Sequence, residues 1–224
     1  MENSKILLER AIQILRLGQV SQNRWAAGGG TILKEYFGHR LSKDIDIFID
    51  DVQYLSALSS RCNDEATEAL DYVEAGRYIS LTFPEGKIDF IASPPLTPFA
   101  HKEAIFLGHH ILWEHPIEIV AKKMFFRGEY AIPRDIFDLV VAYHSQYKEQ
   151  LIQVLCDMPD KLEAFYQGFV RQLNQEGYIP YSIANREMIL QNGQEYIGKE
   201  FHLCQQLLSQ LNPKYSFPTK KLLE

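Results

Sequence analysis

Residues 26–50 read AAGGGTILKEYFGHRLSKDIDIFID, and this stretch decides the fold that the sequence predicts. It places three consecutive glycines, Gly28 to Gly30, between a short apolar run and a helical pattern, Thr31 to Phe37. Glycine lets the backbone approach a ligand closely, and the free amide groups at the start of a helix favour negative charge. The sequence therefore predicts a phosphate-binding turn between a strand and a helix.

A pair of carboxylates follows the glycines. Asp44 and Asp46 alternate with isoleucines, so we expect Lys43 to Ile49 to form a strand. On a strand this spacing places both carboxylates on one face, about 6–7 Å apart. Mg²⁺ typically takes one or two carboxylates together with substrate phosphates. A phosphate-binding turn beside such a pair of carboxylates is typical of sites that catalyse phosphoryl or nucleotidyl transfer.

Composition bounds the class of protein. The chain has 224 residues, a hydrophobic share of 46% and a formal net charge of −6, which fits a globular protein with one large domain or two small ones. The negative charge argues against nonspecific coating of nucleic acid. No apolar run approaches the length of about 20 residues that a membrane span needs, and the N-terminus does not read as a signal peptide. The three scattered cysteines predict neither a disulfide framework nor a zinc site, so we expect a cytoplasmic protein.

The middle of the chain predicts further strands. Asp50-Asp51 is expected to cap a helix that runs in pieces to about Ala75, and Tyr78 to Phe83 alternates as a strand does. The turn 84–86 makes residues 87–91 the return strand of a hairpin. Asp89 lies on that strand, and from the residues alone it is either a solvent-facing aspartate on an edge or a third carboxylate for the pair upstream.

The second half predicts helices. Prolines begin two of them, Pro116 to Arg127 and Pro133 to Tyr143, and from Lys148 onward the pattern gives three or four more. We therefore expect an α+β fold, in which a small mixed β-sheet flanked by helices is followed by a C-terminal helical bundle. The expected domains are a core that contains the sheet, residues 1–114, and a helical domain that completes the active-site cleft, residues 115–224.

Two motifs carry a family resemblance. Gly29-Gly30-Thr31 followed by Gly38-His39-Arg40-Leu41-Ser42-Lys43-Asp44-Ile45-Asp46 resembles the nucleotidyltransferase superfamily related to DNA polymerase β, and most of all its AbiEii/AbiGii toxin branch. A helix with Glu118 and Lys123, followed by Arg134-Asp135 and Asp138-Leu139, resembles a second motif of that branch. The resemblance covers about residues 24 to 145.

The resemblance implies site residues. Catalysis and the binding of Mg²⁺ or Mn²⁺ fall to three carboxylates: Asp44, Asp46 and Asp89. Nucleotide binding falls to seven residues: Gly29, Gly30, Thr31, Arg40, Ser42, Lys123 and Asp138. Asp135 would help to shape the site, and Lys122 can take the place of Lys123 in this register. The alternative for the second motif is a surface salt-bridge network between two helices, which contributes little to stability.

The resemblance also implies a function. It is the transfer of a nucleotide from a nucleoside triphosphate to an acceptor hydroxyl, with RNA, notably transfer RNA, as the acceptor. The protein would be the toxin of a bacterial toxin–antitoxin or phage-defence system, with a cognate antitoxin. Two alternatives are a small-molecule nucleotidyltransferase of the antibiotic-modifying kind and a catalytically silent fold that binds a nucleotide or a partner protein.

Overall fold

The computed structural model describes residues 2–175 and 177–215 and divides the chain into two compact units. The first unit contains the chain up to Tyr36 and the residues Ser42–Glu118. The second contains the short segment Phe37–Leu41 and the chain from Ile119 onward. The predicted α+β class is confirmed, with a mixed sheet in the first unit and helices in the second. The functional division at residue 114 stays a prediction.

The first unit is built on a mixed sheet. The described residues form seven strands in the order β3-β4-β5-β2-β1-β7-β6. β2 pairs with β5, and β1 with β7, in parallel, and the other neighbours are antiparallel. The strand bounds are β1 (Trp25–Gly28), β2 (Ile45–Ile49), β3 (Asp71–Ala75), β4 (Tyr78–Phe83), β5 (Gly86–Ala92), β6 (His101–Phe106) and β7 (His109–Glu114).

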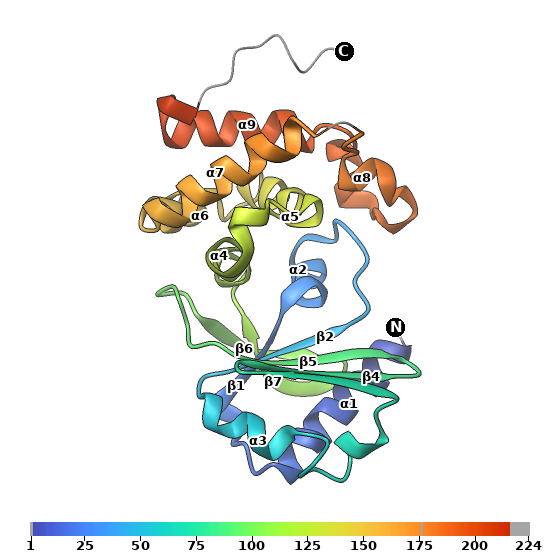
Figure 1. The fold of residues 1–224 in the computed structure, drawn as a ribbon. Helices are drawn as coiled ribbons and strands as arrows, with labels where there is room; N and C mark the ends of the chain where they lie inside the picture. The colour runs from blue at the N-terminus through green and yellow to red at the C-terminus, as the bar shows by residue number, and fades with distance from the viewer. Residues whose placement is uncertain (1, 176, 216–224) are drawn as a thin grey trace. The chain divides into compact units, whose positions relative to one another are not determined.

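Helices cover the two sides of this sheet differently. Figure 1 shows α1 (Glu2–Leu17) and α3 (Leu55–Leu58) on one side and α2 (Gly29–Phe37), which follows β1, on the other. Helix α1 contacts β2 and β5, and Ile45, Ile47 and Ile49 on β2 are at most 2% exposed. Because side chains alternate along a strand, the aspartate between Ile45 and Ile47 faces away from α1.

The predicted helix between residue 50 and Ala75 is wrong in its second half. Asp51 does cap a helical turn, because its side chain accepts a hydrogen bond from the amide of Gln53. The helical pieces then run only over Val52–Tyr54, α3 and Ala66–Glu68, and residues 71–75 form the edge strand β3. All five β3 side chains are exposed, so this strand has no buried face and no apolar alternation to announce it.

The second unit is helical. The helices that proline was expected to begin are confirmed as α4 (Pro116–Arg127), whose first residues lie in the first unit, and α5 (Pro133–Tyr143). Beyond them lie α6 (Lys148–Cys156), α7 (Pro159–Leu173), α8 (Tyr181–Ala184) and α9 (Glu200–Leu211). Phe137 and Phe169 are fully buried, and α5 contacts α6, α8 and α9. No helix of the described residues is long and apolar enough to cross a membrane.

Candidate active site

Two acidic residues of the first unit are brought together by the sheet register. Asp46 on β2 pairs directly with Asp89 on the parallel strand β5. On the other side of β2, Asp46 pairs with Gly28 at the end of β1. Residues that pair in this way project from the same face of a sheet. Asp46 and Asp89 therefore share one face on neighbouring strands, next to the start of the glycine turn.

The glycine turn is fitted closely to Asp46. Gly29 has a positive φ of 65°, and a Cβ added there would stand 1.8 Å from Oδ2 of Asp46. Such a distance is far inside van der Waals contact, so any side chain at this position displaces the carboxylate. A Cβ at Gly28 would likewise stand 2.2 Å from Oε2 of Glu114, a buried carboxylate at the end of β7. The turn is therefore bare backbone between two acidic side chains.

Thr31 supports the start of the aspartate strand. Its hydroxyl, on a side chain that is 2% exposed, donates a hydrogen bond of 2.5 Å to the backbone carbonyl of Asp44. Strand β2 begins one residue later, at Ile45, so alternation along the strand does not fix the direction of Asp44. The exposed Asp44 carboxylate instead lies near the turn into β5, with Oδ1 3.7 Å from the position of a Cβ on Gly86.

Asp89 is held by its neighbours in the sheet. The hydroxyl of Ser80 on β4 donates a hydrogen bond to Oδ1 of Asp89, and Nζ of Lys87 lies 3.7 Å from the same oxygen. Ser80 is 3% exposed, whereas the Lys87 side chain is 46% exposed. Neither residue was expected from the sequence, although Lys87 lies two residues before Asp89 on the same strand face.

Two of the three predicted carboxylates are arranged as a divalent cation requires. The described residues contain no group of three or more His, Cys, Asp or Glu side chains arranged to hold a metal ion. Two hard oxygen donors do stand in register, and Mg²⁺ commonly takes its remaining ligands from water and phosphate. Asp46 and Asp89 therefore suit such an ion, and ligation by all three predicted carboxylates stays a prediction.

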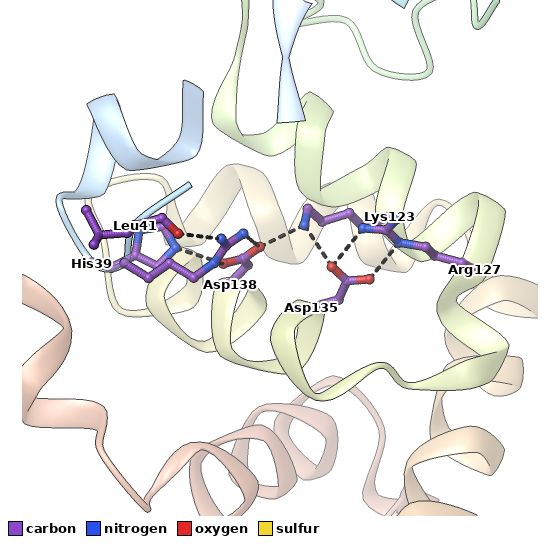
Figure 2. Close-up of polar contacts among 7 residues, drawn as sticks. His39, Leu41, Lys123, Arg127, Asp135 and Asp138 are labelled. Carbon is purple, nitrogen blue, oxygen red and sulfur yellow. Dashed lines mark hydrogen bonds and ion pairs between the residues drawn. The ribbon is translucent and has the colours of Figure 1, made fainter. Parts of the chain in front are cut away.

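Three other residues expected at the site belong to a buried charge network in the second unit, which Figure 2 shows. The centre of the network is Asp138 on α5, which is not exposed at all. Its Oδ1 accepts a hydrogen bond of 2.6 Å from Nε of Arg40, and its Oδ2 accepts one of 2.8 Å from Nη2. Nε2 of His39 lies 2.8 Å from the same Oδ1. Arg40 is 2% exposed, so its guanidinium is held in the protein interior.

Lys123 extends the network along helix α4. Its Nζ lies 2.7 Å from Oδ2 of Asp138 and 2.7 Å from Oδ1 of Asp135. Arg127, one turn further on, donates to both oxygens of Asp135. Lys123 and Asp135 are each 10% exposed. The alternative of a salt-bridge network between the two helices is correct as to the ion pairs, but the network does not lie at the surface, since it is buried at Asp138 and most exposed at Arg127.

Burial and charge act against each other in this network. Burial raises the pKa of Asp138, but the charges of Arg40 and Lys123, together with hydrogen bonds from Arg40 and His39, outweigh burial and hold that pKa well below its usual range. Burial lowers the pKa of His39, even though Asp138 acts in the opposite direction. His39 is therefore a neutral ring that donates from Nε2 to an ionised carboxylate. Its Nδ1 is buried without a hydrogen-bond partner among the described residues.

The remaining expected residues are placed as follows. Ser42 is half-buried in the first unit, just before Asp44, and Lys122 is 5% exposed on α4. Sequence reasoning missed His39, Ser80 and Glu114, although the position of Ser80 opposite Asp89 follows once the hairpin register is known.

Comparison with known proteins decides the family. Residues 18–195, more than half of the chain, match the family described as "Nucleotidyl transferase AbiEii toxin, Type IV TA system". The chain belongs to this family. It is therefore a nucleotidyltransferase toxin of a toxin–antitoxin system, and the family in general implies a nucleotide substrate and a cognate antitoxin. No curated protein matches the chain at a significant level.

The chain is also similar to solved structures at low identity. MenT4, a nucleotidyltransferase toxin from Mycobacterium tuberculosis, is 15% identical with a TM-score of 0.48, and the match covers 97% of this chain and 89% of that one. An antigenic nucleotidyltransferase-like protein from Paracoccidioides brasiliensis is 12% identical with a TM-score of 0.41, and the match covers 100% of this chain and 97% of that one.

Proposed function

We propose that this toxin transfers a nucleoside monophosphate from a nucleoside triphosphate to a hydroxyl of RNA, with the end of transfer RNA as the acceptor and pyrophosphate leaving. The observation that supports this proposal is the pairing of Asp46 with Asp89 on one face of the sheet, beside a glycine turn that has no side chains of its own and against which the Asp46 carboxylate packs. Carboxylates and bare backbone amides at one place suit a substrate that carries both a metal ion and phosphates.

Each predicted site residue of the first unit has a role in this proposal. Asp44 and Asp46 hold Mg²⁺ or Mn²⁺, which when bound neutralises the charge of the triphosphate. Asp89 orients the acceptor hydroxyl and accepts its proton on a carboxylate oxygen. The amides of Gly29 and Gly30 donate to the phosphates, and Ser42 adds a hydroxyl donor. Thr31, whose hydroxyl already binds the carbonyl of Asp44, keeps the strand start in place.

The second unit contributes charge. Arg40 and Lys123 both contact Asp138, and each has N–H donors beyond those contacts that would be available to a triphosphate. In this proposal Asp138 sets the positions of the Arg40 and Lys123 side chains and does not itself touch the phosphates. Lys122 is the second candidate for the lysine that meets the nucleotide.

A labelling experiment tests the proposal. The protein is incubated with each labelled ribonucleoside triphosphate, MgCl₂ and total RNA, and label in RNA is measured. We expect incorporation by the unmodified protein and none by Asp46→Asn, while Asp71→Asn, which changes an exposed carboxylate on β3, is as active as the unmodified protein. Incorporation that survives Asp46→Asn contradicts the proposed site, and label that appears only in a small molecule identifies the antibiotic-modifying alternative.

The proposal extends to the setting in which the toxin acts. Nucleoside triphosphates and transfer RNA occur together in the cytoplasm, so we place the reaction there. A cognate antitoxin restrains it. Co-expression with the neighbouring reading frame should restore growth to cells that the toxin alone arrests, and growth arrest that depends on Asp46 links this effect to the chemistry.

A further inference from the structure

We propose that Ser80 is a positioning residue that holds the Asp89 carboxylate in its working orientation. This inference rests on the proposed function, because it assigns Ser80 a role only through Asp89. Ser80 lies on β4 directly opposite Asp89 on β5, so the two side chains project from the same face of the sheet. The row of paired residues across four strands is therefore Ser80, Asp89, Asp46 and Gly28.

The contact between Ser80 and Asp89 is suited to fixing one oxygen. A serine hydroxyl has a single proton to donate, and that of Ser80 is donated to Oδ1 of Asp89. A hydrogen bond to an ionised acceptor is shorter and stronger than one between neutral groups. Because Ser80 is 3% exposed, bulk water has little access to the hydroxyl position.

The second contact of Asp89 falls on the same oxygen. Nζ of Lys87 lies 3.7 Å from Oδ1, and the Lys87 side chain is 46% exposed. An exposed pair at this distance is weak. Among the described residues, neither of these contacts of Asp89 involves Oδ2, so we assign that oxygen to the acceptor hydroxyl.

The orientation of an aspartate carboxylate needs such support. Rotation about the terminal torsion of aspartate is broad and not confined to narrow wells, so a carboxylate held at no oxygen samples many orientations. Catalytic groups that are misplaced by about 1 Å can lose about a hundred-fold in rate. Of the contacts described for Oδ1, removal of the Ser80 hydroxyl would leave that of the exposed Lys87 ammonium, and it would loosen the residue that orients the acceptor hydroxyl.

The test compares Ser80→Ala with a matched serine elsewhere in the same unit. Ser59 also donates its hydroxyl to a carboxylate, that of Glu74, but neither of these residues belongs to the row that contains Asp46. In the labelling assay we expect Ser80→Ala to lower kcat about ten-fold or more, with the KM for the nucleoside triphosphate within about two-fold of its original value. Ser59→Ala should leave both constants unchanged, and Ser80→Thr, which keeps the hydroxyl, should recover most of kcat.

A double substitution connects the effect to Asp89. Ser80→Ala should cause no further loss in a protein that already carries Asp89→Asn, because residues that act as a unit are not additive. Full activity of Ser80→Ala, or an equal further loss in the Asp89→Asn background, overturns the role of Ser80 and leaves the proposed function intact. If Asp89→Asn itself is fully active, or the unmodified protein labels no acceptor, both this inference and the corresponding part of the proposed function are overturned. Thermal unfolding midpoints of all variants separate a loss of folding from a loss of positioning.

Discussion

Arg40 and Asp138 are 98 residues apart in the sequence and form a two-point ion pair in which neither side chain is more than 2% exposed. Bidentate pairing of a guanidinium with a carboxylate fixes geometry as well as charge. Through this pair, the segment Phe37–Leu41 is fastened to helix α5. Two residues that we propose for the nucleotide site therefore also fix the position of this segment in the second unit.

Replacement of Asp138 should therefore destabilise the protein strongly. Asp138→Asn leaves the buried charge of Arg40 without its counter-ion, and the loss of one partner of a buried pair costs about 3–5 kcal/mol. Urea denaturation of the variant measures this loss. Arg40→Met combined with Asp138→Leu should be more stable than Asp138→Asn, because the buried guanidinium is removed and Lys123 keeps its ion pair with Asp135. Lys5→Met, at an exposed pair with Glu9, should change little. A double variant less stable than Asp138→Asn contradicts this account.

Acid should weaken the fold from about neutral pH downward. The folded-state pKa of His39 is lowered, chiefly by burial, so the folded protein binds fewer protons than the unfolded chain below an ordinary histidine pKa of about 6.5. The free energy of unfolding then falls as the pH falls through that value, by at most about 1.4 kcal/mol per pH unit for one group. The lowered pKa values of His115 and His144 act in the same direction. The lowered pKa of Asp138 contributes stability that is present above about pH 4 and is lost in stronger acid.

A variant of His39 isolates the contribution of this residue to the pH dependence of stability. His39→Gln keeps a side-chain donor for Asp138 but does not titrate, so its stability should fall less steeply between pH 8 and pH 5 than that of the unmodified protein. Urea midpoints at several pH values give the slope. The exposed His202 provides the matched control, since His202→Gln should leave the slope as it is. Equal slopes for all three proteins exclude His39 as a contributor.

Alanine at Gly29 should abolish activity. Its Cβ would overlap Oδ2 of Asp46, and φ at this position is 65°. Gly108 is a suitable control in the same unit, since its φ of 93° is also positive but no atom lies within 4 Å of an added Cβ. Both variants carry a backbone cost of about 1–2 kcal/mol, so thermal unfolding should shift in both. Only Gly29→Ala should lose label incorporation, and a Gly29→Ala protein as active as Gly108→Ala would show that the turn tolerates a side chain.

Lys123 should affect stability more than Arg127. Lys123→Met removes an ammonium that is 10% exposed and contacts both Asp135 and Asp138. The Arg127 side chain, which pairs with Asp135, is 38% exposed. We therefore expect a larger fall in the unfolding midpoint for Lys123→Met than for Arg127→Met. The KM for the nucleoside triphosphate, measured on the same proteins, shows whether Lys123 also meets the nucleotide. An unchanged KM for Lys123→Met, together with a raised KM for Lys122→Met, assigns that role to Lys122.

The sequence predicts the local parts of this molecule well. Short-range patterns locate the glycine turn, the strand that carries Asp46 and the hairpin that carries Asp89, because each depends on residues a few positions apart. The sequence does not predict β3, because residues 71–75 are all exposed and lack the apolar alternation of a half-buried strand. It also could not show that Arg40 pairs with Asp138, because that contact depends on the packing of segments 98 residues apart. The direction of the Asp44 side chain could not be predicted from strand alternation, because β2 begins one residue after Asp44.

The excursion of residues Phe37–Leu41 into the second unit has a consequence for any attempt to divide the protein. The polypeptide passes between the two units after Tyr36, after Leu41 and after Glu118, so no single peptide bond separates them. A fragment that ends near Glu118 would keep Arg40 but lack the carboxylate that neutralises it. The complementary fragment would contain Asp138 with neither Arg40 nor His39. The two units should therefore fold together. Neither fragment alone should be active, and activity should appear only when both fragments are present together.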